Sequence, residues 1–291
     1  MRAEHTPKNL WIKDFIKDIK SENLSPATIR GYYYDLNHFR NWQIETHGKE
    51  LSIEKISEVD LAAYRHSLVS LEAMKVSTVN RRIGTLRLFF KKAFAKGLIR
   101  ADPSIKLRFL RRHKRKKPAV LYKEELNALL RRAGKSAHSF GRRNYLIIKL
   151  ILETGIRVGE INRLKVKDIN AYERSGFISI ENSKSGEKRE LFLNGVVRRA
   201  VSSYLSSRKN IESEDYLFFS KRNKPLSLRS IQQIIRTAAE GAKIKRINVT
   251  AETLRHTFIS NFLESNSGQS KELAALLGYN SVSPLSIYNK G

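Results

Sequence analysis

Apolar side chains recur every three or four positions through the first hundred residues, which is the spacing of one face of an α-helix. This spacing predicts four helices, at about residues 10–19, 26–42, 59–71 and 78–96. Ser25 followed by Pro26 is typical of a helix start, Ser77 is expected to cap the fourth helix, and Gly97 to end it. Four such helices can bury a common core, so the first third of the chain is predicted to be a helical bundle.

The remaining residues combine helical periodicity with two short runs of strand character. Helices are expected at 122–133, 142–153, 154–164, 196–206 and 228–242, and again after Thr250, which is expected to cap a helix with an apolar stripe from Leu254 to Leu263. The runs 177–180 and 189–193 predict a β-hairpin whose turn, 182–188, carries lysines. The expected fold class is therefore mainly α with a small antiparallel β-sheet (α+β).

Charge is the strongest feature of the composition. The 291-residue chain has 56 Lys and Arg against 28 Asp and Glu, a formal net charge of +28. Residues 1–80 are balanced, with eleven basic and eleven acidic groups, whereas residues 81–118 have fifteen basic groups and only Asp102. Because each phosphate neutralised by a cation releases condensed counterions, an excess of this size favours a nucleic acid partner.

Composition also excludes several other classes of protein. Since the chain has no cysteine, it has no disulfide, no thiol nucleophile and no Cys-based zinc site. No run approaches the roughly 18 apolar residues of a membrane span, and the first residues lack the apolar core of a secretory signal. We therefore expect no membrane partner and a cytoplasmic location, associated with the nucleoid if the source is prokaryotic.

The run from Arg111 to Lys117 has charge of one sign and no apolar period, which predicts an extended linker. It suggests a helical domain at 1–110, a linker at 111–118 and a second domain at 119–291. Basic residues of the fourth helix and the linker are the predicted DNA contacts: Arg81, Arg82, Arg87, Lys91, Arg111, Arg112, Lys114, Arg115, Lys116 and Lys117. The alternative for the helix positions is a solvated cationic face without a role in binding.

Five stretches match, in order, the pattern of one known family. They are 25–42 with 78–99, Thr-Gly-Ile-Arg-Val-Gly-Glu at 154–160, Lys-Ser-Gly-Glu-Lys-Arg at 184–189, Leu-Arg-His-Thr at 254–257, and the segment from Leu276 to Tyr288. Together they resemble the tyrosine recombinases of the Xer and phage-integrase kind, over almost the whole chain. The resemblance implies an N-terminal core-binding (SAM-like) domain and a catalytic domain that close on duplex DNA as a C-shaped clamp.

The resemblance also implies a set of catalytic residues. Tyr288 is the expected nucleophile, which forms a 3′-phosphotyrosine bond, and Lys184 is expected to protonate the leaving 5′ oxygen. Arg157 and Arg255 are expected to hold the phosphoryl oxygens, because planar guanidinium groups match their geometry. The phosphotyrosine keeps the energy of the broken bond, so neither ATP, a metal ion nor another cofactor is expected.

Four residues near the expected catalytic residues either support them or differ from the family motifs. Glu160 is expected to support an arginine, and His256 to pack beside the site rather than exchange protons. Glu252 stands where the family usually has histidine or lysine, and Tyr279 where it usually has histidine or tryptophan. A carboxylate should repel the scissile phosphate unless it is protonated or held by an arginine, but Glu252 also suits the positive end of a helix. Tyr279 can donate a hydrogen bond to phosphate, so whether either residue supports or impairs catalysis stays open.

The function implied is site-specific DNA recombination, in which strands are cleaved and rejoined through a 3′-phosphotyrosine intermediate and a Holliday junction. Double-stranded DNA at a specific site is the expected partner, with a homotetramer on two sites, for integration, excision or dimer resolution. The alternative, favoured by Glu252 and Tyr279, is a recombinase-fold DNA-binding protein with weakened or lost catalysis that acts as an accessory or architectural factor. A general RNA-binding protein would have the charge without the ordered motifs.

The linker interpretation makes a measurable prediction. DNA binding should weaken steeply with salt, and neutralising the basic residues between Arg111 and Lys117 should flatten the plot of log affinity against log salt. The slope should decrease by about 0.9 for each phosphate that the linker no longer neutralises. Titrations at several salt concentrations measure this slope. An unchanged slope would show that the run does not contact phosphate.

Overall fold

A computed structural model describes residues 10–22, 24–111, 117–135, 139–171, 174–181, 186–208, 210–220, 222 and 224–288. Backbone contacts divide the chain into two compact units, 1–115 and 116–291. The division falls within the stretch 111–118, where the run of like charges predicts a linker. None of the described helices is long and apolar enough to cross a membrane.

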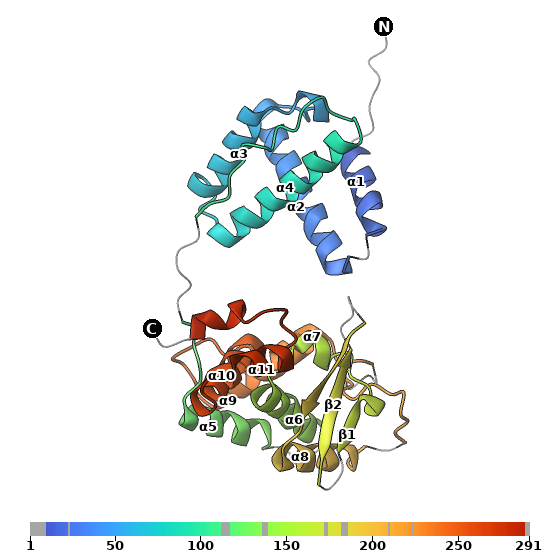
Figure 1. The fold of residues 1–291 in the computed structure, drawn as a ribbon, viewed down its shortest axis with the longest axis vertical. Helices are drawn as coiled ribbons and strands as arrows, with labels where there is room; N and C mark the ends of the chain where they lie inside the picture. Colours follow the sequence, from blue (N-terminus) through green and yellow to red (C-terminus); the bar gives the residue numbers. More distant parts are fainter. Residues whose placement is uncertain are drawn as a thin grey trace. The chain divides into compact units, whose positions relative to one another are not determined.

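The described part of the first unit contains four α-helices, as its apolar spacing predicts (Figure 1). They are α1 (Leu10–Lys20), α2 (Pro26–His47), α3 (Glu58–Ser70) and α4 (Val76–Ala95), with a short 3₁₀ helix, η1 (Ile53–Lys55), before α3. Their apolar faces form one core that includes Phe39, Tyr64 and Phe90, all buried. The fold of this unit is therefore set by helix faces that burial brings together.

Helix starts in this unit follow local hydrogen bonding. Ser25 caps α2 as predicted, since its side chain accepts from the N–H of Thr28 at 3.1 Å and Pro26 opens the helix. The prediction that Ser77 caps α4 was wrong. The helix begins at Val76, and the carbonyl of Lys75 accepts from the N–H of Val79 at 3.1 Å, so Ser77 already lies in the first turn.

A buried carboxylate joins α2 to α4. Asp35 is 2% exposed and accepts a hydrogen bond from the Thr85 hydroxyl at 2.8 Å and another from Arg81. Arg82 Nε lies 3.8 Å from the second carboxylate oxygen of Asp35, and its Nη1 lies 2.7 Å from Nε2 of His38. A buried charge is tolerated when it is paired and hydrogen-bonded, so this cluster fixes the two helices against each other.

The chain leaving the bundle is held against α4. The side-chain amide of Asn80 donates to the carbonyl of Leu110 at 2.9 Å, and the N–H of Leu110 donates back to Asn80 Oδ1 at 2.7 Å. The guanidinium carbon of Arg87 lies 5.3 Å from the ring centre of Phe109. The backbone is thus anchored up to the residue before Arg111.

In the second unit, described strands at 169–192 form a three-stranded antiparallel sheet of order β1-β2-β3. β2 (Gly176–Glu181) and β3 (Lys188–Phe192) are the predicted hairpin, with Ile178 opposite Leu191. β1 (Ile169–Ala171), which follows the 3₁₀ helix η2 (Val166–Asp168), adds a third strand that was not predicted from the sequence. At three residues, β1 is too short to show an alternating pattern. The predicted fold class, mainly α with a small antiparallel sheet, is confirmed.

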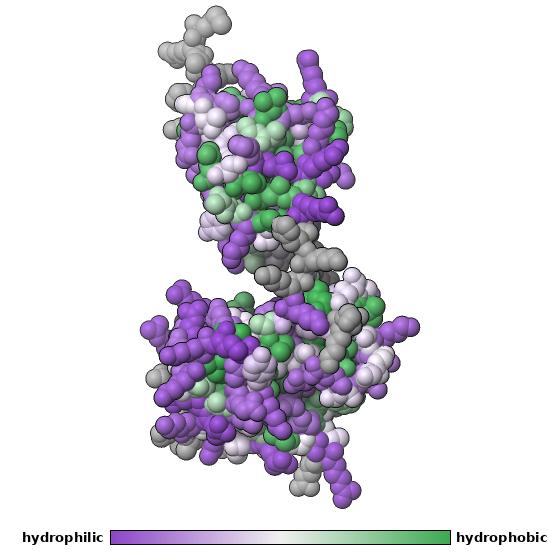
Figure 2. Space-filling view, turned by 90° about the vertical axis from the view of Figure 1, so that its left-hand side faces the viewer, coloured by the Kyte–Doolittle hydropathy of each residue, from purple (hydrophilic) through white to green (hydrophobic). Residues whose placement is uncertain are grey.

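Helices pack beside the sheet and around α6 (Ser139–Thr154) (Figure 1). Most of the Leu and Ile residues of α6 are buried. The surrounding helices are α5 (Lys123–Ala133), α7 (Val158–Ile161), α8 (Gly195–Leu205), α9 (Leu228–Gly241), α10 (Ala251–Ser265), α11 (Ser270–Leu276) and the 3₁₀ helix η3 (Ser283–Tyr288). Figure 2 shows the second unit as mainly hydrophilic on the side in view, with apolar residues in small separate patches. The predicted helix at 154–164 is shorter, because Gly155 has a positive φ of 63° and Arg157 is the residue before the first turn.

The Asp35 cluster yields a stability prediction. Asp35→Asn should lower the free energy of unfolding by about 2–4 kcal/mol, because it removes the charge that compensates two arginines, one of them mostly buried. Urea denaturation measures the change, and exposed Asp14→Asn is the matched control. Equal effects of the two substitutions would mean that the cluster does not stabilise the bundle.

Candidate active site

Helix α10 supplies the central residues of the site. Thr250 caps it as predicted, with its hydroxyl accepting from the N–H of Thr253 at 3.2 Å. Arg255 follows on the inner face and is 3% exposed. Its guanidinium donates to the carbonyl of Gly155 and, at 3.3 Å, to that of Leu277. Arg255 therefore joins the loop before α7 to the end of α11.

Gly155 allows the first of these contacts. Its φ is +63°, and an added Cβ would lie 2.5 Å from Phe258 and 2.8 Å from Leu277. Any other residue would be strained in its backbone and would collide with the core below α10. The glycine of the 154–160 motif is thus required by close packing as well as by conformation.

Glu160 organises two arginines at one edge of the site. It accepts from the N–H of Arg157 at 2.8 Å and from the Arg157 guanidinium at 3.2 Å. Nη2 of Arg189, on β3, lies 2.9 Å from both carboxylate oxygens, and its Nε donates to the carbonyl of Leu276 at 2.9 Å. Burial alone would raise the pKa of Glu160, but the backbone hydrogen bond and the two arginines lower it below its ordinary value. Glu160 therefore stays ionised and supports arginines, as expected.

Tyr279 lies against both predicted phosphate-binding arginines. The guanidinium carbon of Arg157 is 5.3 Å from its ring centre and that of Arg255 is 5.4 Å away. Cations at this range are attracted by the electron-rich face of an aromatic ring. One aromatic residue thus holds together two cations that come from different segments.

Tyr288 reaches the same place from η3. Its hydroxyl is hydrogen-bonded to Nδ1 of His256, and the centres of the two rings are 5.7 Å apart. It packs at the edge of a small apolar cluster that includes Phe258, Leu277 and Leu285. Burial, and then the neighbouring Tyr279 and Glu252, raise the pKa of Tyr288 well above that of a free phenol, against the opposing charge of Arg255. The phenol is therefore protonated at neutral pH.

The structure thus brings together Arg157, Arg255, Tyr279 and Tyr288 of the predicted catalytic residues. Glu252 lies in the first turn of α10 with 67% of its side chain exposed, and Lys184 lies outside the described residues. His256 was expected only to pack beside the site, yet it contacts the hydroxyl of Tyr288. Nothing in the helical spacing of the sequence marks that contact.

The predicted DNA-binding residues of α4 differ in their surroundings. Arg81, Arg87 and Lys91 are exposed. Arg81 also donates to Asp35, but its side chain is 52% exposed, whereas that of Arg82, in the same cluster, is only 12% exposed. Its position makes Arg82 a structural residue of the bundle rather than a surface cation. Arg111 and Lys117 are exposed, and Arg112, Lys114, Arg115 and Lys116 lie outside the described residues.

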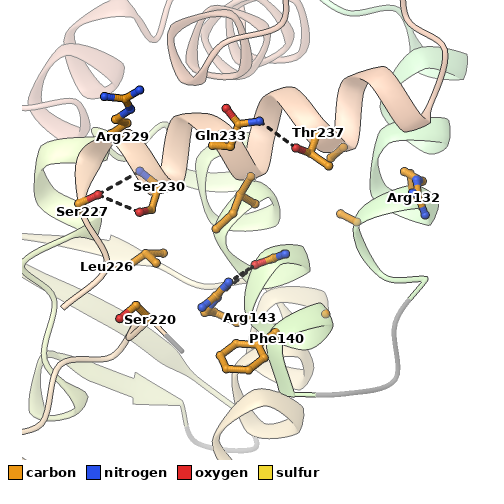
Figure 3. A pocket seen from close by; sticks show the side chains of 15 residues that line it. Arg132, Phe140, Arg143, Ser220, Leu226, Ser227, Arg229, Ser230, Gln233 and Thr237 are labelled. Atoms are coloured by element: carbon orange, nitrogen blue, oxygen red, sulfur yellow. Dashed lines mark hydrogen bonds between the residues drawn. The ribbon is translucent and has the colours of Figure 1, made fainter. Parts of the chain in front are cut away.

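A separate cavity of about 690 Å³ lies beside α9, between it and the ends of α5 and α6 (Figure 3). It is lined by polar residues of α9, including Arg229, Ser230 and Gln233, and by Arg143, which donates to the carbonyl of Phe219 at 2.7 Å. None of the described catalytic candidates lines it. Within the described parts of the chain, no three His, Asp or Glu residues form a cluster that could hold a metal ion.

Two family models match the chain. The phage integrase family matches residues 119–291, and the N-terminal SAM-like domain of phage integrases matches residues 12–97. The chain therefore belongs to the phage integrase family, which confirms the family predicted from its motifs.

Individual proteins are similar over nearly the whole chain. The tyrosine recombinase XerC of Lactobacillus leichmannii is 27% identical over 282 residues, which cover 95% of this chain and 92% of that protein. XerC of Bacillus subtilis is 24% identical, covering 96% and 90%. Among solved structures, XerH bound to its difH substrate before cleavage has a TM-score of 0.75 at 22% identity, covering 96% of this chain and 80% of that one. A λ integrase tetramer bound to a Holliday junction has a TM-score of 0.72 at 20% identity, covering 97% and 78%.

The close packing at Gly155 can be tested directly. Gly155→Ala should lower the free energy of unfolding by about 2–4 kcal/mol, through backbone strain and collision with Phe258. Thermal or urea unfolding gives the value. Gly159→Ala is the matched control, because a Cβ there meets nothing within 4 Å, and it should be neutral. Similar losses for both would contradict the packing argument.

Proposed function

We propose that this protein is a site-specific DNA recombinase in which Tyr288 is the nucleophile. The observation that carries the proposal is the convergence of three separate segments: Arg157, from the loop before α7, and Arg255 of α10 both lie over the ring of Tyr279. Tyr288 of η3 is hydrogen-bonded to His256, the residue that follows Arg255 on α10. Family membership and the similarity to Xer recombinases support the same activity.

The arginines bind the scissile phosphate in this proposal. The side chain of Arg157 is 39% exposed, so its guanidinium can reach a phosphate from solvent. Arg255 is fixed by two backbone carbonyls, and a guanidinium has five N–H donors, so donors are left for the phosphoryl oxygens. Both cations stabilise charge that develops as the phosphorus gains a fifth oxygen.

Cleavage then transfers the phosphoryl group to the protein. The oxygen of Tyr288 forms a bond to phosphorus while the bond from phosphorus to the 5′ oxygen breaks, and Lys184 gives the leaving oxygen a proton. Attack by the 5′ hydroxyl of another strand reverses the step and releases Tyr288. Because the phosphotyrosine keeps the bond energy, rejoining needs no ATP.

Strand exchange requires several copies of the chain. We propose that four protomers act on two DNA sites through a Holliday junction, for integration, excision or dimer resolution. The λ integrase tetramer on such a junction supports this arrangement by similarity of fold. The protein would act in the cytoplasm, where its DNA lies.

DNA binding is assigned to both units. Residues 1–110 form the core-binding domain, 111–118 the basic linker and 119–291 the catalytic domain. Exposed Arg81, Arg87 and Lys91 on α4 are the proposed phosphate contacts of the first domain, since phosphate contacts come mainly from exposed basic side chains.

The alternative, a binding protein without catalysis, depends mainly on the charge of Glu252. In the structure the side chain of Glu252 is largely exposed and lies 3.6 Å from His256. The described ion pairs and hydrogen bonds of Arg157 and Arg255 do not include it. Glu252 therefore does not pair with the arginines that are proposed to bind the phosphate. Catalysis is the better supported function.

Covalent trapping tests the proposal. Once footprinting has located a binding site, a nicked DNA substrate that loses its cleaved fragment should accumulate a covalent protein–DNA adduct. Tyr288→Phe should abolish the adduct while retaining DNA binding, because the phenyl ring lacks the attacking oxygen.

Tyr279→Phe is the matched control, because Tyr279 is the other tyrosine beside the two arginines. It keeps the aromatic ring between the arginines and should still form the adduct. An adduct that survives in Tyr288→Phe but not in Tyr279→Phe would assign the nucleophile to Tyr279, and no adduct at a bound cognate site would refute the enzyme.

A further inference from the structure

Three side chains lie in a row on the outer side of the site. The hydroxyl of Tyr288 is hydrogen-bonded to Nδ1 of His256, and Nε2 of His256 lies 3.6 Å from Oε1 of Glu252. His256 and Glu252 are four residues apart on α10, so the helix itself sets their separation. The histidine therefore lies between the nucleophile and a carboxylate.

This order favours one tautomer of the histidine. A neutral imidazole carries its proton on one nitrogen and offers a lone pair at the other. A carboxylate beside Nε2 stabilises the proton on that nitrogen, which leaves the lone pair on Nδ1, the atom that faces Tyr288. His256 in this tautomer accepts the phenolic hydrogen bond and is oriented to take the proton.

The surrounding charges suit this role. Burial lowers the pKa of His256 below 6.5, Glu252 acts against the decrease, and the charge of Arg255 adds to it. The imidazole is therefore neutral at pH 7. The groups that face it are Glu252 and Arg255 of α10, Tyr288 of η3 and, beyond the phenol, Tyr279. Since Tyr288 is protonated at this pH, its attack on phosphorus requires a base.

We propose that His256 is the general base for Tyr288 and that Glu252 is the carboxylate that positions it. This inference rests on the proposed function. As the bond from Tyr288 oxygen to phosphorus forms, the phenolic proton moves to Nδ1 of His256, while the 5′ oxygen leaves with a proton from Lys184. On rejoining, the 5′ hydroxyl returns its proton to Lys184 and His256 returns its own to the oxygen of Tyr288, so the site is restored.

The proposal gives the acidic residue at position 252 a positive role. On repulsion alone, removing its charge should help a phosphate to bind. On the proposed arrangement, removing the charge should slow proton transfer, because the imidazolium formed during attack would have no carboxylate beside it. Glu252→Gln therefore separates the two accounts by the sign of its effect.

The experiment measures single-turnover adduct formation from pH 5 to about 9 on the nicked substrate. Wild-type cleavage should fall as the pH drops below a midpoint that lies under 6.5, because protonated His256 cannot accept the proton. His256→Gln should reduce the plateau rate by about a hundredfold or more and remove this limb. Glu252→Gln should reduce it about two- to fivefold, since an exposed ion pair is weak, and move the midpoint to lower pH, because the charge that raises the pKa of His256 is gone.

A second substrate separates the base from the acid. Sulfur in place of the bridging 5′ oxygen leaves as a thiolate and needs no proton. It should restore cleavage by Lys184→Ala but leave His256→Gln slow. Exposed His66→Gln and Glu264→Gln are matched controls and should behave as wild type, and all variants should keep the wild-type melting temperature and DNA affinity.

Failure of this inference differs from failure of the proposed function. If the wild type forms an adduct through Tyr288 but His256→Gln keeps the rate and pH profile, or Glu252→Gln is faster, the base assignment is overturned and the recombinase stands. If the wild type forms no adduct at a bound cognate site, the function itself is wrong.

Discussion

The site depends on the burial of one guanidinium group. Arg255 is almost fully enclosed, and a charge in that position is tolerated only because the carbonyls of Gly155 and Leu277 accept its hydrogen bonds. Those two carbonyls belong to the loops that also contain Arg157 and Tyr279. The hydrogen bonds that satisfy the buried charge of Arg255 therefore also position Arg157, and they place Tyr279 beside both arginines.

A second connection fixes the opposite edge of the site. Arg189 on β3 holds Glu160 with one nitrogen and the carbonyl of Leu276 with another. It joins the hairpin to α7 and α11, so β3 is tied to the two segments that flank the phosphate-binding arginines. Tyr288, by contrast, lies in a short 3₁₀ helix on the smaller apolar cluster of the unit. Leu285 is the buried residue of η3, whereas α10 buries seven residues, so opening η3 would expose less buried surface than opening α10.

The charged residues around Tyr288 have different functions in the proposed reaction. The arginines attract the phosphate, but they do not ionise the phenol, since burial and the nearby Tyr279 and Glu252 raise its pKa. His256, a half-buried and neutral histidine at the phenolic oxygen, supplies the base that the arginines cannot provide. The carboxylate that departs from the family pattern then belongs to the handling of the proton and not to the binding of the phosphate.

The local sequence determined most of the helices, their caps and the family of this protein. Helical spacing alone predicted the four helices of the first unit, Ser25 and Thr250 capped helices as expected, and the order of the motifs identified the family, because periodicity, caps and motif spacing are properties of neighbouring residues. Tertiary structure decided what depends on distant residues. It set the start of α4 at Val76, added the short strand β1, and placed Arg82 in a buried cluster. It also brought His256 to Tyr288, 32 residues further along the chain, a contact that exists only because η3 folds back onto α10.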